Sequence, residues 1–239
     1  MKNTTHKIFV FDVGNTLIAK PSNRMVSVLV NDLSAIKNAG NIIGIATMRN
    51  LAMLNELIAQ VNFDFIIALN GAYVECENKI LRDSPIDITE LIQITNTLNH
   101  YNANYNLYAK LSIVNLTEQR DIVYGIELKN CSNYIDSLRT QFPNFTFHIW
   151  EKGKTCDIHS INVSKSIAMK QVCEHFGIPL QNSIAFGDGF NDIELFKLCG
   201  VSVAMETAPI ELKQIATFIT KSVTDKGVSW ALKHFPLWK

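Results

Sequence analysis

Two stretches far apart in the sequence share one pattern, an apolar run that ends in an acidic turn. Residues 7–17 read KIFVFDVGNTL, where a predicted strand delivers Asp12 to the point at which it stops. Residues 184–195 read IAFGDGFNDIEL, where an apolar run is followed by Asp188 and Asp192 in a glycine-rich turn. Open α/β sheets bind their ligands at the carboxyl ends of their strands. The two stretches therefore predict one sheet with acidic groups along one edge.

The first seventy residues alternate between apolar and amphipathic segments. The ranges 8–11, 41–47 and 63–69 are mainly apolar, and the ranges 22–39 and 51–61 between them have helical periodicity. Apolar runs without alternation are typical of parallel strands that are covered on both faces. The same alternation resumes later, with expected helices at 164–176, 191–199, 209–215 and 228–234 and expected strands at 183–186, 201–204 and 218–220. We predict an α/β fold with a Rossmann-like, doubly wound parallel sheet.

The middle of the chain follows a different pattern. It contains a predicted hairpin and further segments that suggest antiparallel pairing, with strands at 72–77, 79–82, 105–114, 122–128, 145–150 and 156–161 and helices at 88–99 and 133–142. We expect this part to be an inserted α+β cap domain over residues 73–154. Residues 1–72 and 155–239 would then form the core.

Composition excludes several classes of partner. The 239 residues are 47% hydrophobic with a formal net charge of zero, and no block of basic residues favours nucleic acid. No apolar run approaches the length of roughly 18 residues that a membrane span needs. The start of the chain lacks the pattern of a signal peptide, and the five cysteines form no CxxC pair. We therefore expect a cytoplasmic protein that binds neither nucleic acid nor membrane.

Polar residues at strand ends and helix starts suggest phosphoryl transfer. Asp12, Thr47 and Lys165 would lie at one edge of the predicted sheet with the Asp188/Asp192 pair. A carboxylate can act as a nucleophile toward phosphorus, and a transferring phosphoryl group needs cations and hydrogen-bond donors around it. Mg²⁺ prefers oxygen ligands that include one or two carboxylates.

Each of these residues also allows a purely structural interpretation. Asp12 would then cap the turn after its strand, and Thr47 would cap the end of another. Lys165 would be a solvated residue of a first helical turn. The Asp188/Asp192 pair would be favoured by the dipole at a helix N-terminus.

The complete set of motifs resembles the haloacid dehalogenase superfamily, in its Cof-type, phosphoglycolate-phosphatase-like sugar phosphatase branch. The first family motif, DxDxT, is matched by Asp12 and Thr16 in DVGNT, and the second by Thr47 in GIATMRN. An NGA turn follows the third strand at residues 70–72, and Lys165 in NVSKSIAM matches the third motif. The fourth motif, GDGxND, is matched residue for residue in GDGFND. The resemblance covers essentially the whole chain.

The resemblance implies a Mg²⁺-dependent phosphatase acting on a small phosphorylated metabolite such as a sugar phosphate or phosphoglycolate. Asp12 would be the nucleophile that forms an aspartyl-phosphate, helped by Lys165 and Thr47. The implied metal site consists of Asp12, the Gly14 carbonyl, Asp188 and Asp192. The implied phosphate-binding residues are Thr47, Lys165 and Asn191.

The chain departs from the family pattern at one catalytic position. Gly14 stands where the second Asp of DxDxT protonates the leaving group and activates water, a function typically worth 10²–10⁴-fold in rate. One explanation is a substrate with a leaving group that needs no acid, although hydrolysis would still need a base. A second is that a cap residue or the substrate supplies the proton, with Glu151, His148 and His159 as candidates by type alone. Alternatively, the protein binds a phosphorylated ligand or partner with little turnover.

Overall fold

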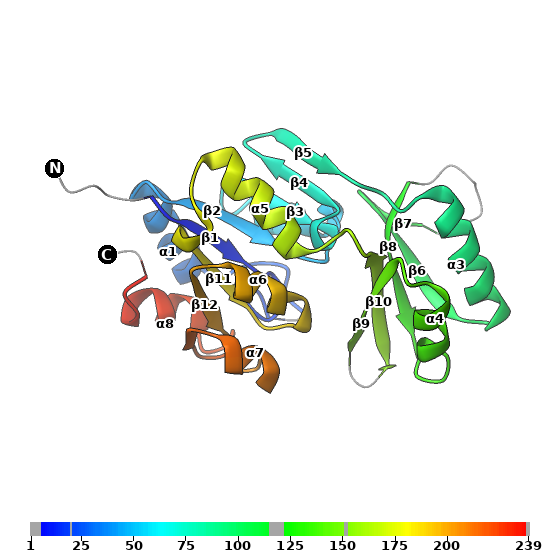
Figure 1. The fold of residues 1–239 in the computed structure, drawn as a ribbon. Coiled ribbons are helices and arrows are strands. Elements are labelled where there is room, and N and C mark those ends of the chain that lie inside the picture. The colour runs from blue at the N-terminus through cyan, green and yellow to red at the C-terminus, as the bar shows by residue number, and fades with distance from the viewer. Residues whose placement is uncertain (1–5, 20, 115–121, 151–152, 238–239) are drawn as a thin grey trace.

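The computed structural model describes residues 6–19, 21–114, 122–150 and 153–237 (Figure 1). The larger of the sheets in this part has eight strands, in the order β13 (Phe218–Ile219), β12 (Val201–Ala204), β11 (Ser183–Gly187), β1 (Ile8–Phe11), β2 (Ile42–Ala46), β3 (Phe65–Ala68), β4 (Tyr73–Cys76) and β5 (Lys79–Asp83). Strands β13 to β3 pair in parallel. Strands β4 and β5 add an antiparallel hairpin at one edge. The predicted α/β fold with a parallel core sheet is confirmed.

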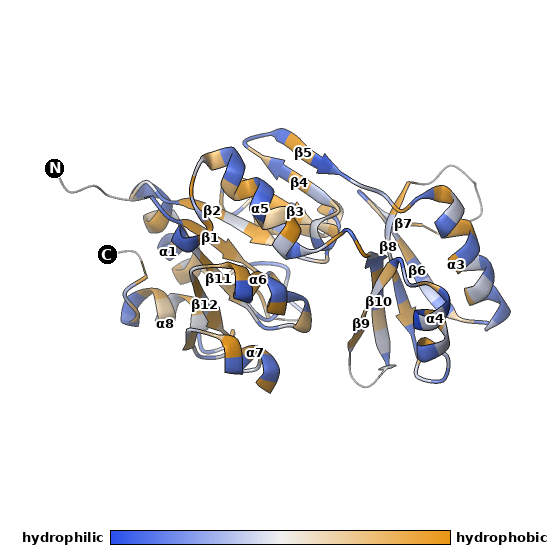
Figure 2. Ribbon diagram, in the orientation of Figure 1, coloured by the Kyte–Doolittle hydropathy of each residue, from blue (hydrophilic) through white to orange (hydrophobic). Residues whose placement is uncertain are grey.

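Helices cover both faces of this sheet because successive side chains of a strand point to opposite faces. Phe9 and Phe11 of β1 belong to an apolar cluster that includes α1 (Ser27–Asn38) and α8 (Gly227–His234). Ile8 and Val10 belong to the opposite cluster, which includes α5 (Lys165–Phe176), α6 (Ile193–Leu198) and α7 (Ile210–Ile215). Figure 2 shows the apolar residues along the central strands and mixed colours along the helices.

The second sheet forms the cap, and its order within the described residues is β7 (Ile113–Val114), β6 (Asn104–Ala109), β8 (Val123–Lys129), β10 (Thr155–Ser160) and β9 (Phe145–Trp150). All of its pairings are antiparallel. One face packs against α3 (Ile88–His100) and α4 (Ile135–Gln141) through an apolar cluster of its own. The other face is therefore left for polar residues.

Strand pairing corrects the expected domain boundaries. Strands β4 and β5 lie in the range expected for the cap, yet they extend the core sheet. Strand β10 lies in the range expected for the core, yet it pairs with β8 and β9. The chain thus crosses between the two units at residues 84–87 and again at 161–164. A hairpin has the same local signature in either unit, so sequence alone could not assign it.

Two expected elements differ in detail. The range 51–61 forms the short 3₁₀ helix η1 (Leu51–Leu54) followed by α2 (Asn55–Ile58). The expected strand at 105–114 is divided into β6 and β7, which pair with each other. Further 3₁₀ turns are η2 (Leu69–Gly71), η4 (Leu180–Asn182) and η5 (Phe190–Asp192).

A buried asparagine explains where β6 and β7 separate. The Asn50 side-chain amide donates to the carbonyl of Ala109 at 3.2 Å and to that of Ser112 at 3.0 Å. The backbone N–H of Leu51 donates to the Lys110 carbonyl at 3.0 Å. These bonds hold the turn of the cap against the core loop that follows β2.

None of the helices in the described ranges is long and apolar enough to cross a membrane.

The close approach of β2 and β3 gives a test of the core. A Cβ added at Gly44 would lie 2.4 Å from the Phe65 ring. We expect Gly44→Ala to lower the free energy of unfolding by about 1–3 kcal/mol, the usual cost of overpacking a core, as measured by urea denaturation. Gly14→Ala is the control, since a Cβ there meets nothing within 4 Å. Equal stability of the two variants would contradict this packing argument.

Candidate active site

The polar residues that follow the central strands lie at one edge of the core sheet. Asp12 follows β1, Thr47 follows β2 and Asp188 follows β11. The sheet positions them: the Asp12 N–H donates to the Phe186 carbonyl at 2.9 Å, and the Thr47 N–H donates to the Ile67 carbonyl at 2.8 Å. The backbone at this edge is thus held by the same bonds that build the sheet.

A buried lysine joins two of the carboxylates. Helix α5 begins at Lys165. The hydroxyl of the preceding residue, Ser164, caps the helix by accepting a hydrogen bond from the Ile167 N–H. The Lys165 side chain is fully buried, and its Nζ lies 2.6 Å from Asp12 Oδ1 and 2.7 Å from Asp192 Oδ1. Burial alone would lower the pKa of Lys165, but attraction to Asp12 and Asp192 raises it above its usual value. The amine therefore remains a cation at the base of the site.

Asp192 organises the loop after β11. Its Oδ2 accepts from the backbone N–H groups of Asp188 at 3.1 Å and Gly189 at 3.0 Å. Because its Oδ1 is bonded to Lys165, both carboxylate oxygens of Asp192 have protein partners. Asp192 is thus placed to orient Asp188 and Lys165.

Burial perturbs the two carboxyl groups nearest the cavity. It raises the pKa of Asp12 to about 7; Lys165 opposes this shift, while Asp192 and Asp188 add to it. Burial likewise raises the pKa of Asp188 to about 6, against a hydrogen bond that Asn15 Nδ2 donates to Asp188 Oδ2 at 3.0 Å. Each group resists ionisation in this setting, which a cation between them would reverse.

The same residues fit a divalent metal ion. Ligand oxygens of Asp12, Asp188 and Asp192 all lie within 4.8 Å of one another. Hard cations such as Mg²⁺ take carboxylate oxygens together with water and phosphate. When ionised, these three carboxylates carry more negative charge than the amine of Lys165 offsets. A metal ion bound there would supply the missing positive charge.

The acidic edge opens into a cavity of about 600 Å³ between the core and the cap. The predicted residues that line it are Asp12, Gly14, Thr47, Asp188 and Asn191. Lys165 and Asp192 do not line it, since both are fully buried beneath it. The predicted residues are therefore all at one site, in two layers.

Sequence reasoning missed several residues that line the same cavity. Arg49 and Asn15 come from the core loops, and Glu127 and Asp157 come from the cap. Arg49 and Asn15 could have been found as neighbours of Thr47 and Asp12 in strand-end turns. Glu127 and Asp157 sit within predicted strands, and nothing local marks them. Trp150 of the cap also lines the cavity.

The candidate proton carriers differ from these residues in their positions. His148 and His159 do not line the cavity. Burial lowers the pKa of His148 to about 4 and that of His159 to about 3, so both are neutral at neutral pH. His148 instead contacts Asn70, whose side chain also accepts from Asn191 Nδ2 at 3.4 Å. Glu151 lies outside the described residues.

The sequence profile of the haloacid dehalogenase-like hydrolase family matches residues 9–144 and 120–232 of this chain. The chain belongs to this family. The Cof-type resemblance expected from the four motifs is thereby confirmed. The profile spans both the core strands and the cap, so the match covers the acidic edge and the sheet that faces it.

Named relatives of this hydrolase are similar over nearly its whole length. The 5-amino-6-(5-phospho-D-ribitylamino)uracil phosphatase YcsE of Bacillus subtilis is 26% identical, with 97% of this chain and 96% of the relative covered. A Streptococcus pyogenes protein, named as a candidate bifunctional phosphatase/peptidyl-prolyl cis-trans isomerase, is also 26% identical over 97% of this chain. The chain spans 54% of the length of that relative.

Solved structures show the same fold. The subclass IIB sugar phosphatase BT4131 superposes with a TM-score of 0.85 at 23% identity, covering 97% of this chain and 99% of that protein. The core and cap of this hydrolase are thus arranged as in that structure.

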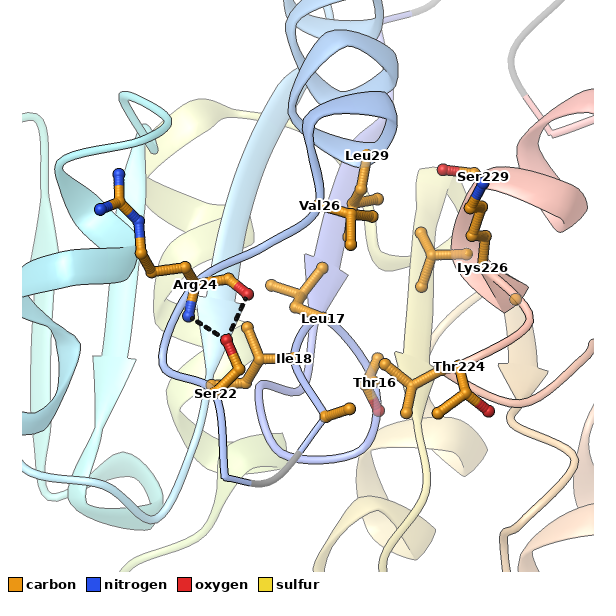
Figure 3. Close-up of a pocket in the computed structure, with 14 residues that line it drawn as sticks. Thr16, Leu17, Ile18, Ser22, Arg24, Val26, Leu29, Thr224, Lys226 and Ser229 are labelled. Carbon is orange, nitrogen blue, oxygen red and sulfur yellow. Dashed lines mark hydrogen bonds between the residues drawn. The ribbon is translucent and has the colours of Figure 1, made fainter.

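A second cavity of about 260 Å³ lies between the turn after β1 and the start of α8 (Figure 3). Apolar side chains such as Leu17, Leu29 and Val228 contribute much of its lining. Thr16, the last residue of the DVGNT motif, lines this cavity and not the one that Asp12 lines. Thr16 therefore lies apart from the acidic edge of the sheet.

Metal binding to the hydrolase should depend on pH. Because the folded state raises the pKa of Asp12 from 3.8 to about 7, it binds this proton more tightly than the unfolded chain does. The metal-free protein therefore loses this contribution to stability as the pH rises from about 4 to about 7. Mg²⁺ needs the ionised carboxylate, so we expect it to raise Tm more at pH 8 than at pH 5.5.

Differential scanning calorimetry with and without Mg²⁺ measures this difference. The control is Asp188→Asn, which should reduce the stabilisation by Mg²⁺ at pH 8. An equal rise in Tm at both pH values in the wild type would contradict a site at Asp12.

Proposed function

We propose that this hydrolase is a Mg²⁺-dependent phosphatase that cleaves a small phosphorylated metabolite through an aspartyl-phosphate on Asp12. The observation that carries the proposal is the position of Asp12. Its carboxylate lines an open cavity, while its Oδ1 is held at 2.6 Å by the buried cation of Lys165. The ion pair with Lys165 orients the Asp12 carboxylate toward a ligand in the cavity. It leaves the other charged groups of the cavity available to that ligand.

The proposed reaction has two steps. A bond forms between an Asp12 carboxylate oxygen and phosphorus as the bond from phosphorus to the leaving oxygen breaks, and the leaving oxygen takes up a proton. Water then attacks the phosphorus of the aspartyl-phosphate, which releases inorganic phosphate and restores Asp12. Bound Mg²⁺ would supply positive charge beside the phosphoryl oxygens.

The residues around Asp12 suit a phosphoryl group. Thr47, Asn191 and Arg49 line the cavity together with Asp12. Arg49 is half-buried, and although burial lowers its pKa, attraction to Asp12 opposes that shift. A guanidinium can bind two phosphate oxygens at once. We assign phosphate binding to Thr47, Asn191 and Arg49, and charge neutralisation of Asp12 to Lys165.

A second candidate function rests on Gly14. This residue lines the cavity beside Asp12, where the family motif would place an acid. With no carboxylate there, the leaving oxygen has no proton donor at that position. The alternative is a protein that binds a phosphorylated ligand with little turnover.

The substrate class is also part of the proposal. The relatives named above act on a phosphorylated ribityl compound and on sugar phosphates, and a cavity of about 600 Å³ is large enough for such molecules.

The cysteines are free thiols, which supports the expected cytoplasmic location.

Phosphate release from p-nitrophenyl phosphate and a panel of sugar phosphates tests the proposal. We expect turnover with Mg²⁺ by the wild type and its loss in Asp12→Asn, which removes the nucleophile. We expect Gly14→Asp to raise kcat by about 10²-fold or more on substrates with poor leaving groups, because it restores general acid–base help. The new side chain has room, since a Cβ at Gly14 meets nothing within 4 Å.

Gly14→Asn is the matched control, because it adds similar bulk without an acid. Inert wild type together with an active Gly14→Asp variant would favour the ligand-binding alternative for the natural chain. Equal phosphate release by Asp12→Asn and the wild type would exclude Asp12 as the nucleophile.

A further inference from the structure

The polar face of the cap sheet presents a row of side chains to the core. Strand register places Asn106 opposite Glu127, Glu127 opposite Asp157, and Asp157 opposite His148. The neighbouring residues of these strands, such as Ile126 and Ile158, point the other way into the apolar core of the cap. Because side chains alternate along a strand, all four members of the row share one face.

Two carboxylates stand side by side in the middle of this row. Glu127 and Asp157 are directly opposite each other on β8 and β10, and both line the catalytic cavity. Like charges placed directly opposite in an antiparallel pair destabilise a sheet. Lys129 lies 3.9 Å from Glu127 and is 43% exposed, so it offsets this repulsion only weakly. A cationic or hydrogen-bond-donating group of a ligand is the chemical complement of such a pair of carboxylates.

Neighbouring side chains hold the two carboxylates in place. Asn106 Nδ2 donates to Glu127 Oε2 at 2.7 Å, and Trp150 Nε1 donates to Asp157 Oδ2 at 2.6 Å. Trp150 in turn lies against the loop after β11, since its ring would be 3.1 Å from a Cβ at Gly189. The carboxylates are therefore oriented by the cap before any ligand binds, and Trp150 offers an aromatic surface beside them.

The core side and the cap side of the cavity differ in their charged groups. The core side has Arg49 beside the carboxylates that fit a metal ion, with Lys165 buried beneath them. The cap contributes Glu127, Trp150, Thr155 and Asp157 to the lining, and no basic side chain from the described part of the cap is among them. A substrate with its phosphate on the core side would therefore meet two carboxylates and an aromatic ring at its other end.

We propose that Glu127 and Asp157 select a substrate whose leaving group carries a protonated amine, as in an amino sugar phosphate, and disfavour one that carries a second anion. The proposal rests on the proposed phosphatase function and names its substrate class. An ammonium group donates charge-assisted hydrogen bonds to carboxylates, whereas a substrate carboxylate would be repelled by both. Phosphoglycolate, whose leaving group glycolate carries a carboxylate, is thus disfavoured within the range of substrates that the sequence suggests.

Three hexose phosphates that share one phosphate position test the proposal. Glucosamine 6-phosphate, glucose 6-phosphate and 6-phosphogluconate carry an amine, no further charge and a carboxylate, respectively. We expect kcat/KM to fall by about tenfold at each step in this order, the effect of one charge-assisted contact. Asp157→Asn and Glu127→Gln should each bring the first two substrates to within about threefold of one another. Asp136→Asn, on α4 at the opposite face of the cap sheet, is the control that should keep the wild-type order.

Binding keeps the test independent of turnover. Calorimetric titration of Asp12→Asn with the same three phosphates and Mg²⁺ should give the same order of affinities, even if the wild type hydrolyses nothing. Equal affinity and equal kcat/KM for the amine and neutral compounds, or a preference for 6-phosphogluconate, would overturn the proposal. Absence of hydrolysis with the expected order of binding would count only against the phosphatase function.

Discussion

The contact between the buried amine of Lys165 and the carboxylates of Asp12 and Asp192 is the interaction on which the rest of the site depends. A cation without exposure to water is costly unless it is paired, and breaking such a pair typically costs about 3–5 kcal/mol. The three residues come from the end of β1, the start of α5 and the turn before α6. Their ion pairs therefore form only when the helices of one face have packed on the sheet. Folding of the core and assembly of the catalytic edge are one event.

The cap uses its strands for two purposes at once. Ile126 and Ile158 pack with α3 and α4, and the alternation of side chains then turns Glu127 and Asp157 toward the catalytic cavity. The apolar face stabilises the cap, and the polar face meets the ligand. Substrate preference can therefore change by substitution on one face without disturbing the packing on the other. The Asn50 hydrogen bonds to the cap turn keep this polar face over the core.

The departure from the family motif at Gly14 changes the acid–base groups of the site more than it changes the loop that carries them. Gly14 leaves space beside Asp12 that a larger side chain could occupy. Asn15, with φ of 53°, donates its side-chain amide to Asp188 and so helps to hold a carboxylate of the proposed metal site. The loop keeps the two carboxylates in place although it lacks the usual acid. Proton transfer to the leaving group is the step that this change affects.

The sequence by itself determined the α/β core, the family and the residues at the strand ends. Apolar runs, glycine turns and the positions of Asp12, Thr47 and Asp188 relative to them are local signals, and parallel strands bring their carboxyl ends together. Only the tertiary structure decided that the hairpin of β4 and β5 belongs to the core and that Glu127 and Asp157 line the cavity from the cap. Those outcomes depend on which strands pair and in which register. Pairing is set by contacts between residues distant in the chain, which no local pattern records.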